Sequence, residues 1–264
     1  MSAWDVYQDR MNSSGATRRD ASLIREKRLL TERVPESLSY TTVKVFTRDN
    51  SVNVDTVEAQ ERAAVQNVAI IDSGNLDEKI LITMPDEGMD VGNLIYWEEN
   101  YWIVAEKDFK TTVYTRTKLK QCNHLLQWVS DDDQIMKQWC IIEDGTKYLT
   151  GELEDRKFII TRGDSRIAMT ITRNDETVKF GRSRRFLIDD PESPQKLAYL
   201  LTKPLKLGSV FNGKGCFKFV LQEVTSTADD NQELGIADYY KHFPKEEVPS
   251  PPDIVPGTNK RMWL

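Results

Sequence analysis

The aromatic and acidic residues of the stretch 91–104 form the densest group of side chains that could do chemistry. In the run V-G-N-L-I-Y-W-E-E-N-Y-W-I-V, Trp97 and Trp102 lie on either side of Glu98 and Glu99. Exposed aromatic rings can stack on bases or sugars, and paired carboxylates can exchange protons with a substrate. No base, nucleophile or metal-binding set accompanies them, and aromatic residues of small β domains more often fill the core or cover a subunit contact. We therefore interpret the stretch as the framework of a β domain.

The histidines and cysteines do not form a catalytic or metal-binding pattern. His124 and His242 lie far apart in the sequence, and neither belongs to an H-E-x-x-H or comparable motif. The three cysteines, Cys122, Cys140 and Cys216, are odd in number, form no C-x-x-C pair and lie in apolar, strand-like runs. We expect buried free thiols, no disulfide, no metal and no cofactor.

Three further clusters each have a functional and a structural interpretation. The acidic run 130–133 could attract calcium, but it lacks the spacing of an EF-hand loop, so we predict a solvated hairpin turn. The basic run R-S-R-R at 182–185 could contact phosphate, but the acidic residues of 189–192 favour a balanced loop rim. The glycines of 145–151 and 208–215 match no nucleotide-binding loop. These patterns do not predict an enzyme.

Composition favours a protein of two small domains with a mildly acidic surface. The 264 residues are 39% hydrophobic and 30% charged, with a formal net charge of −6. General attraction to nucleic acid or to an anionic membrane is therefore not expected, although local basic segments could provide either. The chain has no apolar run of 18 residues, and its first residues lack the pattern of a signal peptide, so we expect synthesis and assembly in the cytosol.

Alternating and β-branched runs predict a mainly β fold made of two small antiparallel barrels or sandwiches. The sequence divides into an N-terminal arm at 1–37, a β-barrel domain at 38–130, a second β domain at 131–225 and an extended C-terminal arm at 226–264. The segment 54–65 is compatible with a loop or a short helix. Strands are expected at 39–47, 66–72, 79–84, 91–104 (a hairpin), 111–117, 122–129, 139–151 (two short strands), 157–161, 167–173, 185–188, 196–204 and 207–224 (a second hairpin).

The two arms carry the residues that we expect to contact partners. The basic run 16–33 suits a short amphipathic helix or a segment that becomes ordered on docking, and the Pro-rich segment 245–264 ends in Met-Trp-Leu. That tail fits equally a disordered end or an apolar anchor. With the hairpin tryptophans included, the contact candidates are Trp4, Tyr7, Leu23, Ile24, Leu29, Leu30, Trp97, Trp102, Tyr239, Tyr240, Trp263 and Leu264.

Several segments resemble virion structural proteins of tailed phages that infect Gram-positive bacteria. They are W-D-V-Y-Q-D-R near the N-terminus, D-V-G-N-L-I-Y-W-E-E-N-Y-W-I-V-A-E-K-D, Y-T-R-T-K-L-K-Q-C-N-H-L-L-Q-W and L-G-I-A-D-Y-Y. Residues 66–129 are similar in style to the small β-barrel head-closure proteins of the phage neck. The resemblance covers most of the chain and includes no catalytic motif.

This resemblance implies a homo-oligomeric ring at the neck of a virion, between the DNA-filled head and the tail. Such a head-closure or head–tail connector ring contacts a portal or adaptor protein on one side and a tail protein on the other. It surrounds the channel for genomic DNA, where a net negative charge would let DNA pass without binding. Assembly would take place in the host cytoplasm, without a membrane.

Two other classes of protein fit the same residues. A capsid-associated minor head or decoration protein would use similar β domains and arms, and its icosahedral copy number would identify it. A tail module that binds a host glycan would instead require exposed aromatics or clustered acids to converge in a pocket.

Overall fold

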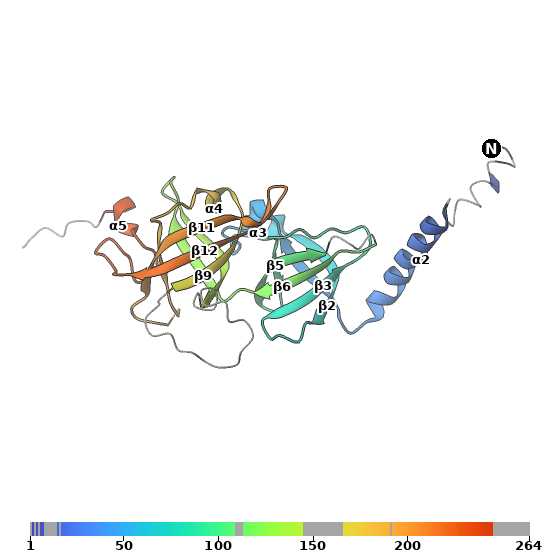
Figure 1. The fold of residues 1–264 in the computed structure, drawn as a ribbon, viewed down its shortest axis with the longest axis horizontal. Coiled ribbons are helices and arrows are strands. Elements are labelled where there is room, and N and C mark those ends of the chain that lie inside the picture. Colours follow the sequence, from blue (N-terminus) through green and yellow to red (C-terminus); the bar gives the residue numbers. More distant parts are fainter. Residues whose placement is uncertain are drawn as a thin grey trace, which may run out of the picture.

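Six antiparallel strands close into the first barrel (Figure 1). The structure, a computed structural model, describes residues 17–108, 113–144, 166–190 and 192–244, with positions 2, 4, 6, 7 and 15. Pairing between β1 and β4 completes the barrel, whose strand order is β1-β2-β3-β6-β5-β4. The strands are β1 (Tyr40–Phe46), β2 (Ala64–Asp72), β3 (Glu78–Thr83), β4 (Leu94–Trp97), β5 (Asn100–Asp108) and β6 (Arg116–Gln121).

The predicted hairpin at 91–104 is confirmed as β4 and β5. Trp97 pairs with Asn100, so Glu98 and Glu99 alone form the loop. Both have positive φ, 46° and 61°, as a two-residue hairpin turn that follows the strand twist requires. The amide of Asn100 donates to the carbonyl oxygen of Glu98 at 2.7 Å and supports the turn.

A second six-stranded antiparallel sheet forms the other domain and nearly closes. Its order is β10-β11-β12-β9-β8-β7, and the guanidinium of Arg184, next to β10, donates to the carbonyl oxygen of Val129 in β7. A core of large apolar residues that includes Trp128, Phe180 and Phe219 fills it. Its strands are β7 (His124–Val129), β8 (Ile135–Asp144), β9 (Arg166–Thr172), β10 (Arg185–Ile188), β11 (Leu197–Phe211) and β12 (Lys214–Val224).

The mainly β fold with two small barrel domains is therefore confirmed, but some strand assignments change. The strand expected at 122–129 forms as β7, yet it pairs with β8 in the second sheet, so the first barrel ends with β6 rather than at residue 130. Instead of a strand at 111–117, β6 begins at Arg116. The first of the two strands expected around Asp144 is part of β8, which begins earlier, at Ile135, and the second lies outside the described residues. The strand expected at 157–161 lies outside the described residues.

The helices are short except for the one that precedes the first barrel. Helix α2 (Arg18–Arg33) begins with a capping box, in which Thr17 and Asp20 each bond the other's backbone N–H. This confirms the helical alternative for the arm. The segment 54–65, left open by the sequence, contains a helix of one and a half turns. The remaining helices are η1 (Val34–Glu36), η2 (Arg48–Asn50), α3 (Val57–Arg62), α4 (Asp175–Lys179) and α5 (Tyr239–His242).

A buried polar network joins the two barrels. The amide of Asn174 donates to the hydroxyl of Ser51 at 3.2 Å and to the side-chain oxygen of Gln138 at 2.8 Å. The side-chain oxygen of Asn174 also accepts the backbone N–H of Thr177 and so caps α4. All four residues are at most 3% exposed. Because an unpaired buried amide costs about 1–3 kcal/mol, this network holds the barrels in one relative position.

Apolar and backbone contacts complete the junction between the barrels. Tyr101 of the first barrel stacks on Trp139 of the second, with ring centroids 5.0 Å apart. Gly92 packs directly on Gly215, and a Cβ atom built on Gly92 would lie 2.2 Å from the Gly215 carbonyl oxygen. The barrels therefore touch backbone to backbone at this point.

Replacing Gly92→Ala should loosen the junction. Gly92 has a φ of +89°, so alanine would be strained by about 1–2 kcal/mol, and the clash with Gly215 adds about 1–3 kcal/mol. We expect the free energy of unfolding, measured with urea, to fall by the sum of both costs.

Gly74→Ala provides the matched control. Gly74 has the same φ of +89°, but a Cβ atom there meets nothing within 4 Å. The control should lose only the strain energy. Equal losses for the two variants would show that the barrels do not depend on this close approach.

Candidate interaction surfaces

Helix α2 projects from the first barrel at one end of the molecule (Figure 1). None of its residues is buried, and Ile24 and Leu29 are 44% and 36% exposed. Leu23 and Leu30 are half-buried. Lys27 forms an ion pair with Asp86 of the first barrel and so fixes one side of the helix. No described helix is long and apolar enough to span a membrane.

The side of α2 opposite Lys27 combines two arginines with an apolar residue. At 100° per residue, Arg18, Arg25 and Leu29 lie in one stripe, whereas Ile24 lies nearer to the Lys27 side. The helix contains six basic and three acidic residues, a net charge of +3, whereas the whole chain carries −6. It is therefore a basic surface on an acidic protein. Upstream of it, Trp4 and Tyr7 stack on each other at 5.7 Å and are 63% and 54% exposed.

At the other end of the molecule, Arg185 holds the segment that follows β12 against the second barrel. Its guanidinium bonds both carboxylate oxygens of Asp230 at 3.0 and 2.8 Å, and Asp238 at 2.9 Å. Thr227 accepts a further bond at 2.8 Å. Residues 226–244, expected to belong to an extended arm, are therefore folded onto the barrel.

The electrostatics of this clamp favour the charged forms of its members. Burial alone would raise the pKa of Asp230, but hydrogen bonds from the backbone N–H groups of Asp238 and Thr227 and from Arg185 outweigh it. The pKa of Asp230 therefore lies below its ordinary value. Arg185 was expected to contribute to a loop rim balanced by residues 189–192, and its actual partners correct that expectation.

The clamp presents an aromatic cluster with a rim of carboxylates, which we call the acidic end. Tyr239 lies edge-on to Tyr240 at 5.3 Å and against Phe243 at 4.8 Å. Asp133 bonds His242 at 2.7 Å and connects α5 to the turn between β7 and β8. The exposed or half-buried acids of the two segments that contact α5, the β7–β8 turn and residues 229–233, are Asp131, Asp132, Asp133, Asp229 and Glu233.

The hairpin tryptophans differ in their surroundings. Trp102 is 4% exposed and belongs to the core of the first barrel, so we withdraw it from the contact candidates. Trp97 is half-buried and packs against the same core, with its ring 5.8 Å from that of Trp102. Trp263 and Leu264 lie outside the described residues. The structure thus brings the candidates together in three separate pairs, Trp4 with Tyr7, Trp97 with Trp102, and Tyr239 with Tyr240.

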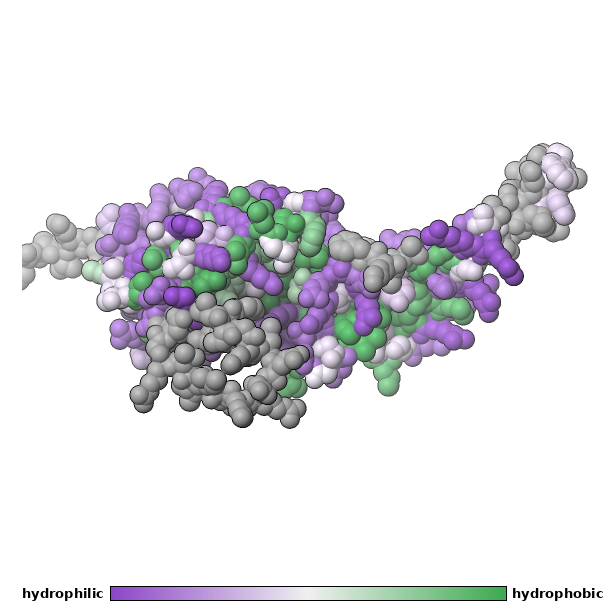
Figure 2. All heavy atoms as spheres, in the orientation of Figure 1, coloured by the Kyte–Doolittle hydropathy of each residue, from purple (hydrophilic) through white to green (hydrophobic). Residues whose placement is uncertain are grey.

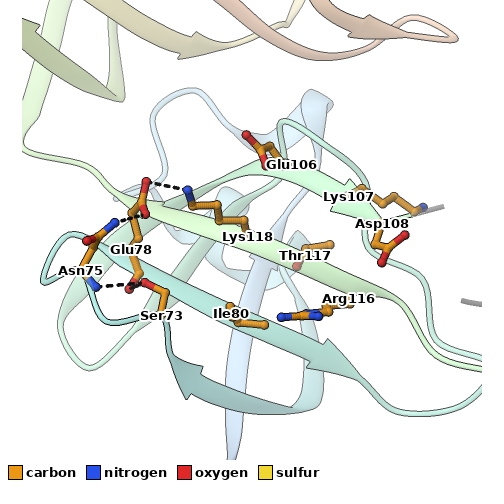
Figure 3. Close-up of a pocket in the computed structure, with 10 residues that line it drawn as sticks. All are labelled: Ser73, Asn75, Glu78, Ile80, Glu106, Lys107, Asp108, Arg116, Thr117 and Lys118. Carbon is orange, nitrogen blue, oxygen red and sulfur yellow. Dashed lines mark hydrogen bonds and ion pairs between the residues drawn. The ribbon is translucent and has the colours of Figure 1, made fainter. Parts of the chain in front are cut away.

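A polar groove of about 480 Å³ crosses the outer face of β3, β6 and β5 (Figure 3). Within it, Glu78 accepts an ion pair from Lys118 at 2.8 Å and a hydrogen bond from Asn75 at 2.6 Å. Its charged residues comprise three acids and three bases: Glu78, Glu106, Asp108, Lys107, Arg116 and Lys118. This balanced, paired surface resembles a solvated barrel face more than a site for one substrate.

A second exposed apolar surface lies on the long β11–β12 hairpin. Leu205 and Leu207 are 41% and 90% exposed, and Lys206 bonds the carbonyl oxygen of Val178 at the end of α4 at 2.6 Å. Figure 2 shows hydrophobic residues gathered over this part of the molecule and again over the first barrel, with hydrophilic residues between them. The hairpin is therefore a further candidate contact.

The remaining sequence candidates have structural roles. Residues 130–134 form the predicted turn, in which Ser130 donates its N–H to Gln134 at 2.8 Å. The cysteines are buried with free thiols, as predicted. Burial raises the pKa of Cys216 to about 12. Among the described residues, no three His, Cys, Asp or Glu side chains are grouped to hold a metal ion.

Sequence reasoning missed the residues that organise both ends of the second barrel. Asn174 could have been identified as a helix cap from the N-D-E-T pattern, but its bonds to Ser51 and Gln138 span distant segments. The pairing of Arg185 with Asp230 and Asp238 has no local signal at all.

Comparisons with known proteins add little. No family model and no curated protein matches the chain. Among solved structures, MrkH, described as a c-di-GMP-dependent transcription regulatory factor, is 8% identical, with 79% of this chain and 86% of that chain covered. The TM-score is 0.22, too low to support an argument about fold or function.

Substitution Arg185→Ala should release the acidic end. It leaves Asp230, whose side chain is 0% exposed, as a buried carboxylate without its cation, a loss of about 3–5 kcal/mol. We expect limited proteolysis to cut within residues 225–243 while the barrels persist. The exposed neighbour Arg182→Ala is the control and should resist cleavage like the wild type. Equal resistance of both variants would contradict the clamp.

Stability should fall in mild acid because of His124. Burial lowers the pKa of His124 to about 4, from an ordinary value near 6.5, with Asp189 opposing and Lys196 reinforcing this shift. Between these values the unfolded chain binds a proton that the folded chain does not, so stability is complete above pH 6.5 and declines as the pH falls. The slope contributed by His124 is at most about 1.4 kcal/mol per pH unit.

The measurement compares wild type with His124→Gln in urea between pH 7 and pH 5, where most carboxylates remain ionised. The variant should show a flatter pH profile. Parallel profiles would contradict the assignment.

Proposed function

We propose that the protein is a structural component of a tailed-phage virion, a head-closure or head–tail connector ring protein at the neck. One observation carries the proposal: a basic helix with exposed apolar residues stands out from a body of two joined barrels. A projecting helix of this kind is suited to docking on a neighbour, and two barrels in fixed relation are suited to setting the geometry of an oligomer.

Other features support the same role. The sequence resemblance to phage virion proteins covers residues 4–10 upstream of α2, the β4–β5 hairpin, the β6–β7 region and the segment 234–240 that leads into α5. The acidic net charge of −6 is compatible with a channel through which DNA slides. Portal or adaptor proteins on one side and tail proteins on the other would use separate surfaces, of which the β11–β12 hairpin is one.

Cryo-electron microscopy of virions that carry a tagged copy of the chain tests this proposal. We expect the tag at the single vertex that bears the tail, as one ring between portal and tail. A label spread over the icosahedral shell would instead identify a minor head or decoration protein, and a label at the tail tip would favour the glycan-binding alternative.

A further inference from the structure

The two ends of the molecule are complementary in charge and chemistry. At one end, α2 presents Arg18 and Arg25 beside Leu29, all exposed. At the other, the aromatic cluster of Tyr239, Tyr240 and Phe243 is linked through the Asp133–His242 bond to the acidic β7–β8 turn. Figure 1 places α2 and α5 at opposite extremes of the long axis. One copy therefore cannot satisfy both surfaces itself, whereas two copies in a row can.

We infer that the exposed side of α2 docks on the acidic end of a second copy of this chain. This contact deepens the proposed function and rests on it, because it supplies the head-to-tail interface that a ring requires. Heterologous contacts of this kind form a ring when the rotation between successive copies closes.

The chemistry of the two surfaces favours this occupant over an unrelated protein or a nucleic acid. Arginine binds carboxylates with paired hydrogen bonds and stacks on aromatic rings, so both components of the acidic end suit it. Leu29 matches the apolar faces of the aromatic cluster and of Leu234, which is 41% exposed. A nucleic acid would suit only α2 and would leave the acidic end of the molecule without a partner.

The local ion pairs leave the charges of both surfaces available. Lys27 is paired with Asp86 on the opposite side of α2. At the acidic end, Lys241 is paired with Asp238, and Asp133 is the rim carboxylate that contacts His242. Asp131 and Asp132 are both exposed at the tip of the β7–β8 turn, and their charges act on the nearby ammonium group of Lys179. Because Lys179 forms its ion pair with Glu176, these two carboxylates are suited to receive Arg18 and Arg25 of the next copy.

The first step of the test measures self-association of the full chain by sedimentation velocity. We expect wild-type oligomers that weaken as salt is raised, because exposed ion pairs are screened. Arg18→Glu with Arg25→Glu, or Asp131→Lys with Asp132→Lys, should raise the dissociation constant at least tenfold. Arg19→Glu with Arg62→Glu is the matched control for charge, and it should change the constant less than twofold.

The second step mixes the two variants. Each retains one native surface, and their altered surfaces are complementary in charge, so the mixture should form oligomers that contain both chains in equal numbers. A circular dichroism spectrum and urea unfolding of each variant show that the fold is intact. A monomeric wild type at the highest soluble concentration, unimpaired Asp131/Asp132 variants, or a mixture that stays monomeric would each overturn the inference.

Failure of this contact and failure of the proposed function are distinguishable. A shell-bound label in the particle would remove the connector assignment but leave the head-to-tail contact measurable in solution. A neck ring seen in the particle, with both variants unaffected, would remove only the contact.

Discussion

The bonds of Asn174 are the interaction on which the arrangement of this molecule depends. One side chain caps α4, reaches Gln138 in the second barrel and reaches Ser51 in the first. In a dry interface such bonds are directional, and their loss leaves buried polar groups unpaired. Apolar packing around Tyr101 and Trp139 adds stability to the junction, but the polar network selects one orientation. The two barrels are therefore held at a fixed distance and angle.

The contact surfaces at α2 and at the acidic end can build a regular assembly only because the two barrels are fixed relative to each other. If the barrels moved independently, α2 and the acidic end would sample many relative positions, and a head-to-tail contact would produce open chains of varying curvature. A rigid body repeats one rotation from copy to copy. The close approach of Gly92 to Gly215 also helps to fix the barrels relative to each other, because side chains at these positions would separate them.

Sequence reasoning succeeded where structure is local. The apolar strand patterns on either side of Glu98 and Glu99 predicted a hairpin, because the two strands and the turn between them all lie within ten residues. It placed a strand at 122–129 but assigned it to the other barrel, since periodicity identifies a strand and not its partner. The Arg185 clamp brings together residues about 45 and 53 positions apart. Nothing in either segment alone indicates that pairing, so 226–244 was taken as part of an arm.

The capping box of α2 has a consequence for affinity. An isolated helix of 16 residues is marginal in water, and α2 has no buried side chain to support it. The reciprocal bonds of Thr17 and Asp20 contribute about 1 kcal/mol to the helical state before any partner arrives. Whatever docks on α2 binds its helical form, so folding of the helix and binding are thermodynamically linked. The affinity of a contact made by the middle of α2 therefore depends partly on the capping bonds in its first turn.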